Sequence, residues 1–116
     1  MAVPALVRVL NDEDDDLRYF ATRALGNLAA EPGQAVPALV DRLADPNVEV
    51  RRIAARSLGQ FHGHASGAVP ALRRALNKDE ESVKLTAAFA LQEIYPAIMR
   101  DGATPSHTSS TTAPLP

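Results

Sequence analysis

A phrase of five residues, Ala-Val-Pro-Ala-Leu, occurs three times in the chain, beginning at Ala2, Ala35 and Ala68. Both intervals are 33 residues, and the apolar positions that follow each phrase stay in register without a gap. A fixed period of this length is typical of repeat proteins, in which each unit is one small supersecondary structure. We therefore divide residues 1–100 into three tandem units, 2–34, 35–67 and 68–100.

The second unit reads as two helices joined by a turn. Its first helix has Pro37 near the start, where the missing N–H costs nothing. Its second helix is expected over about residues 48–61, capped by Asp45 at its start and by Gly63 at its end. Apolar residues recur at helical spacing in both segments. They are Val36, Leu39, Val40 and Leu43 in the first, and Val50, Ile53, Ala54, Ser57, Leu58 and Phe61 in the second.

Stacking is the way such hairpins bury their apolar faces, because one hairpin cannot cover its own. Aromatic residues make up only 4% of the chain and Trp is absent, so the core is built from Ala, Val and Leu. That composition suits closely packed helices better than a β-sandwich or barrel. The predicted fold is all-α: a right-handed α-solenoid of three 33-residue helix–turn–helix repeats with a disordered C-terminal tail.

Residues 2–94 resemble HEAT repeats, of the short type also found in phycobilisome-lyase proteins. Unit two carries the pattern most fully, as Val36-Pro37-Ala38-Leu39, Asp45-Pro46, Val50-Arg51, Ala54 and Leu58-Gly59. Unit three departs from it, with Lys78 for the turn Asp, Lys84 for the Arg and Gln92 for the Gly. Such a degenerate last repeat is similar to a C-terminal cap.

The C-terminal end carries two predictions. Pro96 is expected to break or kink the helix, so that the apolar residues after it fold back over unit three. Leu85 and Phe89 stand where unit two has Arg52 and Arg56, so either this extension or a partner should cover them. Residues 101–116 form a Ser/Thr/Pro tract with almost no apolar content, which predicts disorder.

The N-terminal helix is unusually apolar for the end of a solenoid, where a polar outer face is normal. Three explanations remain open: the chain is part of a longer solenoid, the helix docks onto another molecule (self-association included), or the exposure is simply tolerated. The residues concerned are Val3, Leu6, Val7, Val9 and Leu10.

Composition excludes several classes of function. The chain has no cysteine, which rules out disulfides, zinc–thiolate sites and thiol catalysis. The net charge of −2 and the pI of about 5.9 lack the basic signature of a nucleic-acid-binding chain. No apolar run approaches the roughly 20 residues that span a membrane. We expect a soluble, cytoplasmic protein without a membrane association, a metal or another cofactor.

Two pairs of opposite charge, Asp12 with Arg18 and Asp45 with Arg51, recur at the same place in units one and two. Catalytic groups need not repeat, so we interpret the pairs as a ladder that braces the turn and the start of the second helix between neighbouring units. The acidic run 11–16 suggests a calcium loop, which would need Gly at its sixth position and Glu at its twelfth. Those two positions are Leu17 and Arg23, so the pattern of a calcium loop is not met.

Candidate catalytic or metal-binding residues are otherwise few. His62 and His64 stand two apart in the loop between units two and three, but no Asp or Glu is spaced to complete a metal site. The chain has no phosphate-binding glycine loop and no Gly-x-Ser-x-Gly motif. An enzymatic function therefore has no residues to carry it.

The outward face of the second helices is the candidate binding surface. The resemblance places these helices on the concave side of the solenoid, and Arg and Tyr are enriched at binding hot spots. The residues are Arg18, Tyr19 and Arg23 from unit one, Arg51, Arg52 and Arg56 from unit two, and Lys84 and Phe89 from unit three. The predicted function is a scaffold-like module that binds a protein or peptide on a mildly basic surface, with an acidic partner among the candidates.

Two further functions follow from the resemblance. In a phycobilin-lyase-like subunit, Arg52 and Arg56 could hold the propionates of a tetrapyrrole, although the chain offers no cluster of catalytic groups. A nucleic-acid-binding module, as in HEAT-like alkylpurine DNA glycosylases, would use the arginine face, although the acidic total charge argues against it. A designed repeat protein without a natural function is a fourth reading.

Overall fold

The computed structural model describes residues 2–100, with side chains described through Pro96. The predicted disordered tail, residues 101–116, lies outside the described residues. Within the described range the fold is all-α, and a short 3₁₀ helix, η1 (His62–Ala68), follows the fourth α-helix. The α-helices are α1 (Ala2–Val9), α2 (Asp15–Leu28), α3 (Pro32–Arg42), α4 (Val48–Gly59), α5 (Val69–Lys78) and α6 (Glu81–Arg100).

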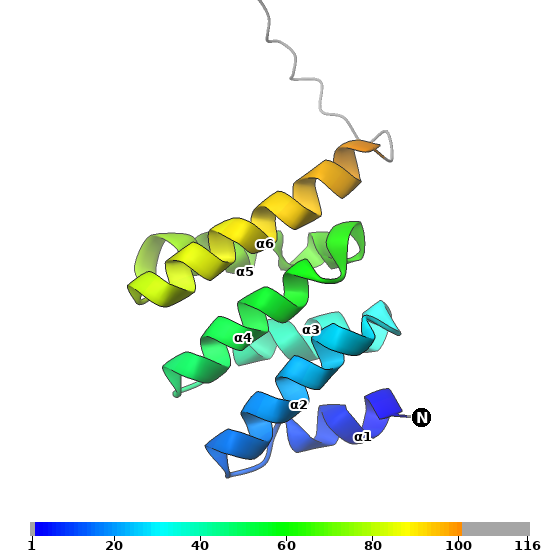
Figure 1. Cartoon of the computed structure of the whole chain (residues 1–116), viewed down its shortest axis with the longest axis vertical. Coiled ribbons are helices and arrows are strands. Elements are labelled where there is room, and N and C mark those ends of the chain that lie inside the picture. The colour runs from blue at the N-terminus through cyan, green and yellow to red at the C-terminus, as the bar shows by residue number, and fades with distance from the viewer. Residues whose placement is uncertain (1, 101–116) are drawn as a thin grey trace, which may run out of the picture.

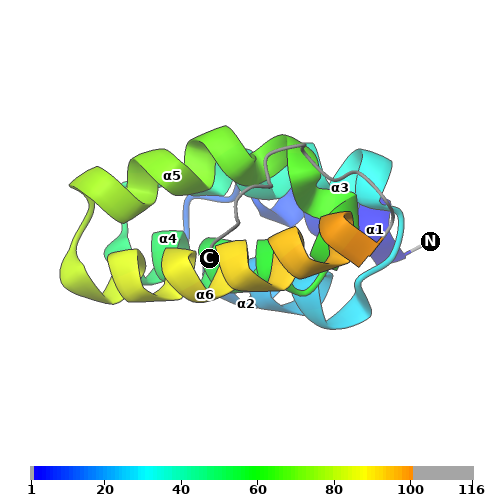
Figure 2. The same ribbon diagram turned by 90° about the horizontal axis from the view of Figure 1, so that it is seen from above.

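The helices form two layers. Each unit contributes one hairpin, α1–α2, α3–α4 or α5–α6, and the hairpins stack in chain order (Figure 1). Seen from the end of the stack, α1, α3 and α5 lie in one layer and α2, α4 and α6 in the other (Figure 2). The second helices of neighbouring units therefore pack side by side, and their layer carries the candidate binding surface.

The core lies between the layers and contains the residues expected from the helical periodicity. Every predicted apolar position in the second helix of unit two, from Val50 to Phe61, is buried. Val3 and Leu10 at the N-terminal end are also buried, and Leu6 and other α1 residues pack partly against the core. Much of the apolar surface of α1 is thus used inside the protein.

Helix α4 begins and ends differently from the sequence prediction. Its N-cap is Asn47, whose Oδ1 accepts the backbone N–H of Glu49 at 2.8 Å, so the prediction that Asp45 caps this helix is wrong. The helix ends at Gly59, and the left-handed residue after it is His62 (φ 51°), so Gly63 is not its C-cap. The 3₁₀ turn of η1 begins at His62 and takes over the connection to α5.

Two glycines allow the second helices to approach closely. A Cβ placed on Gly26 in α2 would lie 2.5 Å from Oγ of Ser57 in α4. A Cβ on Gly59 in α4 would lie 3.0 Å from the Cα of Ala90 in α6. The Leu-Gly step of the repeat is therefore a packing requirement of the stack.

The expected break at Pro96 does not occur. Helix α6 continues through this proline to Arg100, because the ring removes one backbone hydrogen bond but need not end a helix whose neighbouring turns are intact. The fold-back of the chain after Pro96 is thus wrong as predicted. Leu85 and Phe89 remain exposed, at 57% and 68%.

Candidate binding surface

A ladder of charges runs between units, but its pairs are not the predicted ones. Arg18 binds only the backbone carbonyl of Asp12, and Arg51 binds only that of Asp45, while each arginine pairs with a carboxylate of the next unit. Arg18 of α2 donates to Asp45 of the next unit through two hydrogen bonds, Nε to Oδ2 at 2.9 Å and Nη2 to Oδ1 at 3.0 Å. Arg42 donates to the same carboxylate at 2.8 Å, and so does the backbone N–H of Asn47 at 2.9 Å. Both the Arg18 and the Asp45 side chains are buried, so this pair locks units one and two together.

Burial alone would raise the pKa of the Asp45 carboxyl. The hydrogen bonds from Arg18 and Asn47, together with the charges of Arg18 and Arg42, outweigh burial and hold the pKa below its ordinary value. The hydrogen bond to Asp45 raises the pKa of Arg18, and burial opposes that shift only in part. The carboxylate is therefore ionised over the physiological range and serves as a structural anion.

The second rung joins units two and three. Arg51 donates through Nε to the carboxylate of Asp79 at 3.0 and 3.1 Å, and through Nη1 to the carbonyl of Asp45 at 2.8 Å. Lys78 occupies the register of Asp45, and the adjacent Asp79 supplies the carboxylate instead. Unit three thus keeps the ladder despite its departure from the repeat pattern.

The structure divides the eight predicted binding residues into three groups. Arg18 and Arg51 are held in the ladder between units, which removes them from the outward surface where they were predicted. Tyr19, Arg52 and Lys84 are half-buried, and Arg52 pairs with Glu49 at 2.9 Å, a hydrogen bond that raises its pKa. The remaining three, Arg23, Arg56 and Phe89, are exposed.

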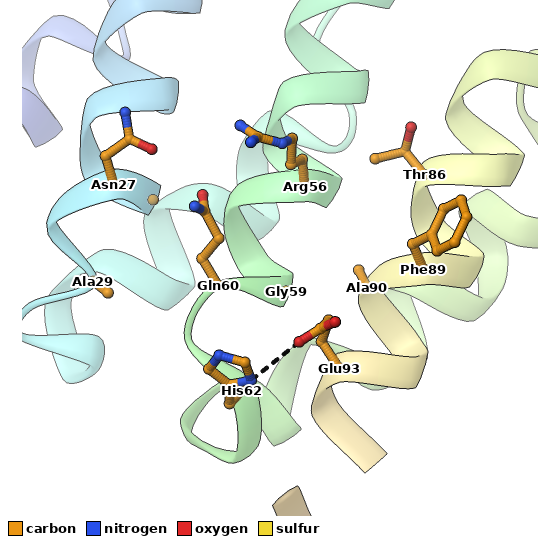
Figure 3. Close-up of a pocket in the computed structure, with 11 residues that line it drawn as sticks. Asn27, Ala29, Arg56, Gly59, Gln60, His62, Thr86, Phe89, Ala90 and Glu93 are labelled. Atoms are coloured by element: carbon orange, nitrogen blue, oxygen red, sulfur yellow. Dashed lines mark ion pairs between the residues drawn. The ribbon is translucent and has the colours of Figure 1, made fainter. Parts of the chain in front are cut away.

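A groove of about 580 Å³ crosses the second-helix layer between α2, α4 and α6. Its floor includes Gly26 and Gly59, where the helices approach most closely. Figure 3 shows the side chains of the groove on these three adjacent helices. The polar and aromatic lining residues are Asn27, Arg56, Gln60, His62, Thr86, Phe89 and Glu93.

The groove combines an exposed aromatic ring, a cation and an unmatched acceptor. Phe89 lies on one side and Arg56 on the neighbouring helix (Figure 3). Oε1 of Gln60 is buried, and within the described residues it accepts no hydrogen bond. Buried acceptors are normally satisfied, so this one is an exception at the contact between α2 and α4. His62 and Glu93 close the groove with an Nδ1–Oε1 contact of 3.3 Å.

Sequence reasoning missed Asn27, Gln60 and Glu93. These three positions are each 33 residues apart and so share one register on the second helices. This shared register could have identified them from the sequence, because equivalent positions of the three second helices face the groove together.

Metal binding finds no support in the described residues, where no three His, Asp or Glu side chains come together. The acidic run 11–16 instead organises the turn before α2. Asp12 Oδ1 accepts the N–H of Asp14 at 2.9 Å, and Asp14 Oδ1 accepts the N–H of Asp16 at 2.8 Å. Asp14 is the N-cap of α2, a position that favours short acidic side chains.

Comparison with protein families decides the wider identity. A family model for HEAT repeats matches residues 2–95, which cover all three hairpins. The chain belongs to the HEAT-repeat family. No curated protein sequence matches this HEAT-repeat chain. In the described part of the chain, none of the helices combines the length and hydropathy needed to cross a membrane.

Proposed function

We propose that this HEAT-repeat chain is a non-catalytic protein-binding module, and that a segment of its partner lies in the groove between α2, α4 and α6. The observation that carries the proposal is Phe89. It is a large apolar side chain, 68% exposed, beside a groove rather than on a featureless surface. Aromatic anchors at such places are the side chains that most often dominate a protein interface.

Charge defines the partner further. Arg56 in the groove and Arg23 on α2 are exposed, and among residues 2–96 neither forms an ion pair. Rim charges of this kind guide the approach of an oppositely charged partner. The proposed partner segment therefore presents an apolar side chain to Phe89 and an acidic one to Arg56.

The competing functions have weaker support. With Arg18 and Arg51 engaged between units, the outward surface keeps fewer cations than a nucleic-acid interface needs. Arg52, one of the two residues assigned to a tetrapyrrole propionate, pairs with Glu49.

A reducing compartment such as the cytoplasm fits the absence of cysteine.

A pull-down from native lysate, read by mass spectrometry, tests the proposal. The parent is compared with Arg56→Glu and with Phe89→Ala, and Arg8→Glu on the opposite layer is the charge-matched control. All four chains are first shown to be folded by circular dichroism and thermal melting. A protein captured by the parent and the control but lost with both groove variants supports the proposal.

Two results contradict it. A partner retained by both groove variants does not bind in the groove. A partner lost with Arg8→Glu, but not with the groove variants, binds on the α1, α3 and α5 layer instead.

A further inference from the structure

Each second helix carries two different stripes on its flanks, and α4 uses both of them to contact its neighbours. The forward stripe faces the next unit, and the backward stripe faces the preceding one. The forward stripe is Arg18, Thr22 and Gly26 in α2, Arg51, Ala55 and Gly59 in α4, and Lys84, Ala88 and Gln92 in α6. The backward stripe is Leu17, Phe20, Ala24 and Leu28 in α2, Val50, Ile53, Ser57 and Phe61 in unit two, and Val83, Thr86, Ala90 and Ile94 in α6.

Contacts between units establish these assignments. Oγ of Ser57, on the backward stripe of unit two, donates to the carbonyl of Thr22 on the forward stripe of α2 at 2.9 Å. The closest neighbour of Gly26 is the same serine, and the closest neighbour of Gly59 is Ala90. The same two stripes therefore meet at both internal junctions.

The large apolar residues on the backward stripe of α2 are exposed, although Phe20 also borders a hollow with Asn47 and Glu49 of unit two, whereas their counterparts in unit two are buried. In unit two, Val50, Ile53, Ser57 and Phe61 are all at most 2% exposed. At the same register in α2, Leu17 is 46% exposed, Phe20 57% and Leu28 48%. Among the described residues no hairpin covers this side of α2. The molecule thus ends in an apolar face whose internal equivalents are covered by another hairpin.

Asp12 is the residue of unit one that is equivalent to Asp45, the carboxylate that binds the arginine of the preceding unit. It stands in the register of Asp45, and the geometry of the turn is the same. Asp45 Oδ1 accepts the N–H of Asn47 at 2.9 Å, and Asp12 Oδ1 accepts the N–H of Asp14 at 2.9 Å. Asp45 also binds the arginine of the preceding unit, whereas Asp12 is exposed. The acceptor is already oriented for a guanidinium group.

We propose that this end face, made of Asp12, Leu17, Phe20, Ala24 and Leu28, is a second binding surface. Its occupant is a HEAT-type hairpin whose second helix presents an arginine, a small residue four positions on and a glycine four positions further. The arginine binds Asp12, and the glycine allows the helix to approach Ala24. The surface is separate from the groove, so this inference does not depend on the proposed function.

A second copy of this chain is not the occupant. Its exposed forward stripe, on α6, has Gln92 where units one and two have Gly26 and Gly59. At Gly26 even a Cβ would come within 2.5 Å of the neighbouring helix, so a glutamine prevents the same close approach. Lys84 replaces the arginine as well and cannot form its two parallel hydrogen bonds.

The test adds the missing hairpin to the full chain. Residues 2–34 are duplicated in tandem ahead of residue 2, so that the added unit supplies Arg18, Thr22 and Gly26 as the forward stripe. Asp12→Asn is then introduced in the original unit of the tandem chain and, separately, in the native chain. Glu13→Gln, an exposed neighbouring acid, is the matched control in both.

The expected result is a difference between the two backgrounds. In the native chain Asp12→Asn leaves the Tm nearly unchanged, because the side chain is exposed and Asn can accept the same N–H. In the tandem chain it lowers the Tm by on the order of 10 °C, because the arginine of the added unit loses a buried partner. Phe20→Ala is expected to show the same difference: it changes the Tm of the native chain little and clearly lowers the Tm of the tandem chain.

Several outcomes overturn the proposal. If Asp12→Asn and Phe20→Ala shift the Tm equally in both backgrounds, or if the tandem chain melts below the native one, the end face does not accept a hairpin. Sedimentation equilibrium of the native chain tests the occupant: a monomer is expected. Concentration-dependent oligomers that Asp12→Asn abolishes would make the occupant a second copy and refute the argument from Gln92.

Discussion

Replacing Asp45 by asparagine tests whether the buried rung holds units one and two together. The substitution keeps the shape of the side chain and an oxygen that can accept the N–H of Asn47. It removes the negative charge that balances two arginines. One is Arg18, whose side chain is only 8% exposed, and the other is Arg42, the second donor to the carboxylate. Breaking a buried ion pair from one side costs more than the pair itself contributes, since the other charge stays buried.

The magnitude follows from what Arg18 retains. Losing one partner of a buried pair typically costs about 3–5 kcal/mol. Arg18 keeps a contact with the exposed Asp15 at 2.6 Å and hydrogen bonds to the carbonyls of Asp12 and Glu13, so the lower end applies. We expect Asp45→Asn to lower the free energy of unfolding by about 3 kcal/mol, or the Tm by roughly 10–25 °C.

Urea denaturation followed by circular dichroism measures this loss, and two matched variants calibrate it. Asp79→Asn breaks the second rung, where both side chains are partly exposed, and should cost about 1 kcal/mol. Glu49→Gln breaks the surface pair with Arg52 and should change stability by less than about 0.5 kcal/mol. The expected order of cost is therefore Asp45, then Asp79, then Glu49.

The reasoning fails if Asp45→Asn unfolds within about 1 kcal/mol of the parent, or if Asp79→Asn costs as much. The first outcome would mean that apolar packing holds the units without help from the rung, and the second would mean that burial of the first rung does not set its importance.

Three further predictions concern pH and packing. Because the pKa of Asp45 is lowered in the folded protein, its contribution to the free energy of unfolding is present above the unfolded pKa and is lost below about pH 4. Urea melts across this range should show that the difference in stability between the parent and Asp45→Asn becomes smaller as the pH falls. Leu58→Ala, at a fully buried site, should cost roughly 2–5 kcal/mol, and Leu28→Ala, at a half-exposed one, less than about 1 kcal/mol; equal losses in urea melts would contradict the core assignment. Gly26→Ala should destabilise by about 1–3 kcal/mol through overlap with α4, whereas Gly33→Ala, with no described atom within 4 Å of its added Cβ, should be neutral or stabilising; thermal melts that reverse this order would refute the close-approach argument.

The helices and the core could be predicted from the sequence because both depend on local periodicity. A helix buries every third or fourth residue, so the spacing of Val50, Leu58 and Phe61 was sufficient to assign the inner face of α4. The repeat of 33 residues then carried the assignment to the other units. The family match over residues 2–95 supports HEAT repeats along this part of the chain.

Details that depend on distant partners could not be predicted in the same way. Asp45 occupies a position before a helix where an N-cap is common, but its carboxylate accepts two of its hydrogen bonds from Arg18, 27 residues earlier in the chain. Asp and Asn are equally good N-caps, so the local pattern could not show that Asn47 would take that role. Pro96 gave a similar error, because the effect of a proline depends on whether the turns around it are held in place.

The error in the candidate surface has a geometric cause that also indicates where to look for a partner. In a stacked layer an internal second helix such as α4 is covered on its inner side and on both flanks, so its outward stripe is much narrower than on an isolated amphipathic helix. Positions 18 and 51, which keep an arginine, lie on the flank, and positions 23, 56 and 89 lie on the outward stripe. There the side chain changes along the stack, from Arg23 and Arg56 to Phe89. Residues on the flank bind the neighbouring unit, whereas residues on the outward stripe are left to distinguish one partner from another. Under the proposed function, a segment that crosses from α2 to α6 meets the two arginines before the aromatic ring, so its acidic and apolar residues must follow in that order.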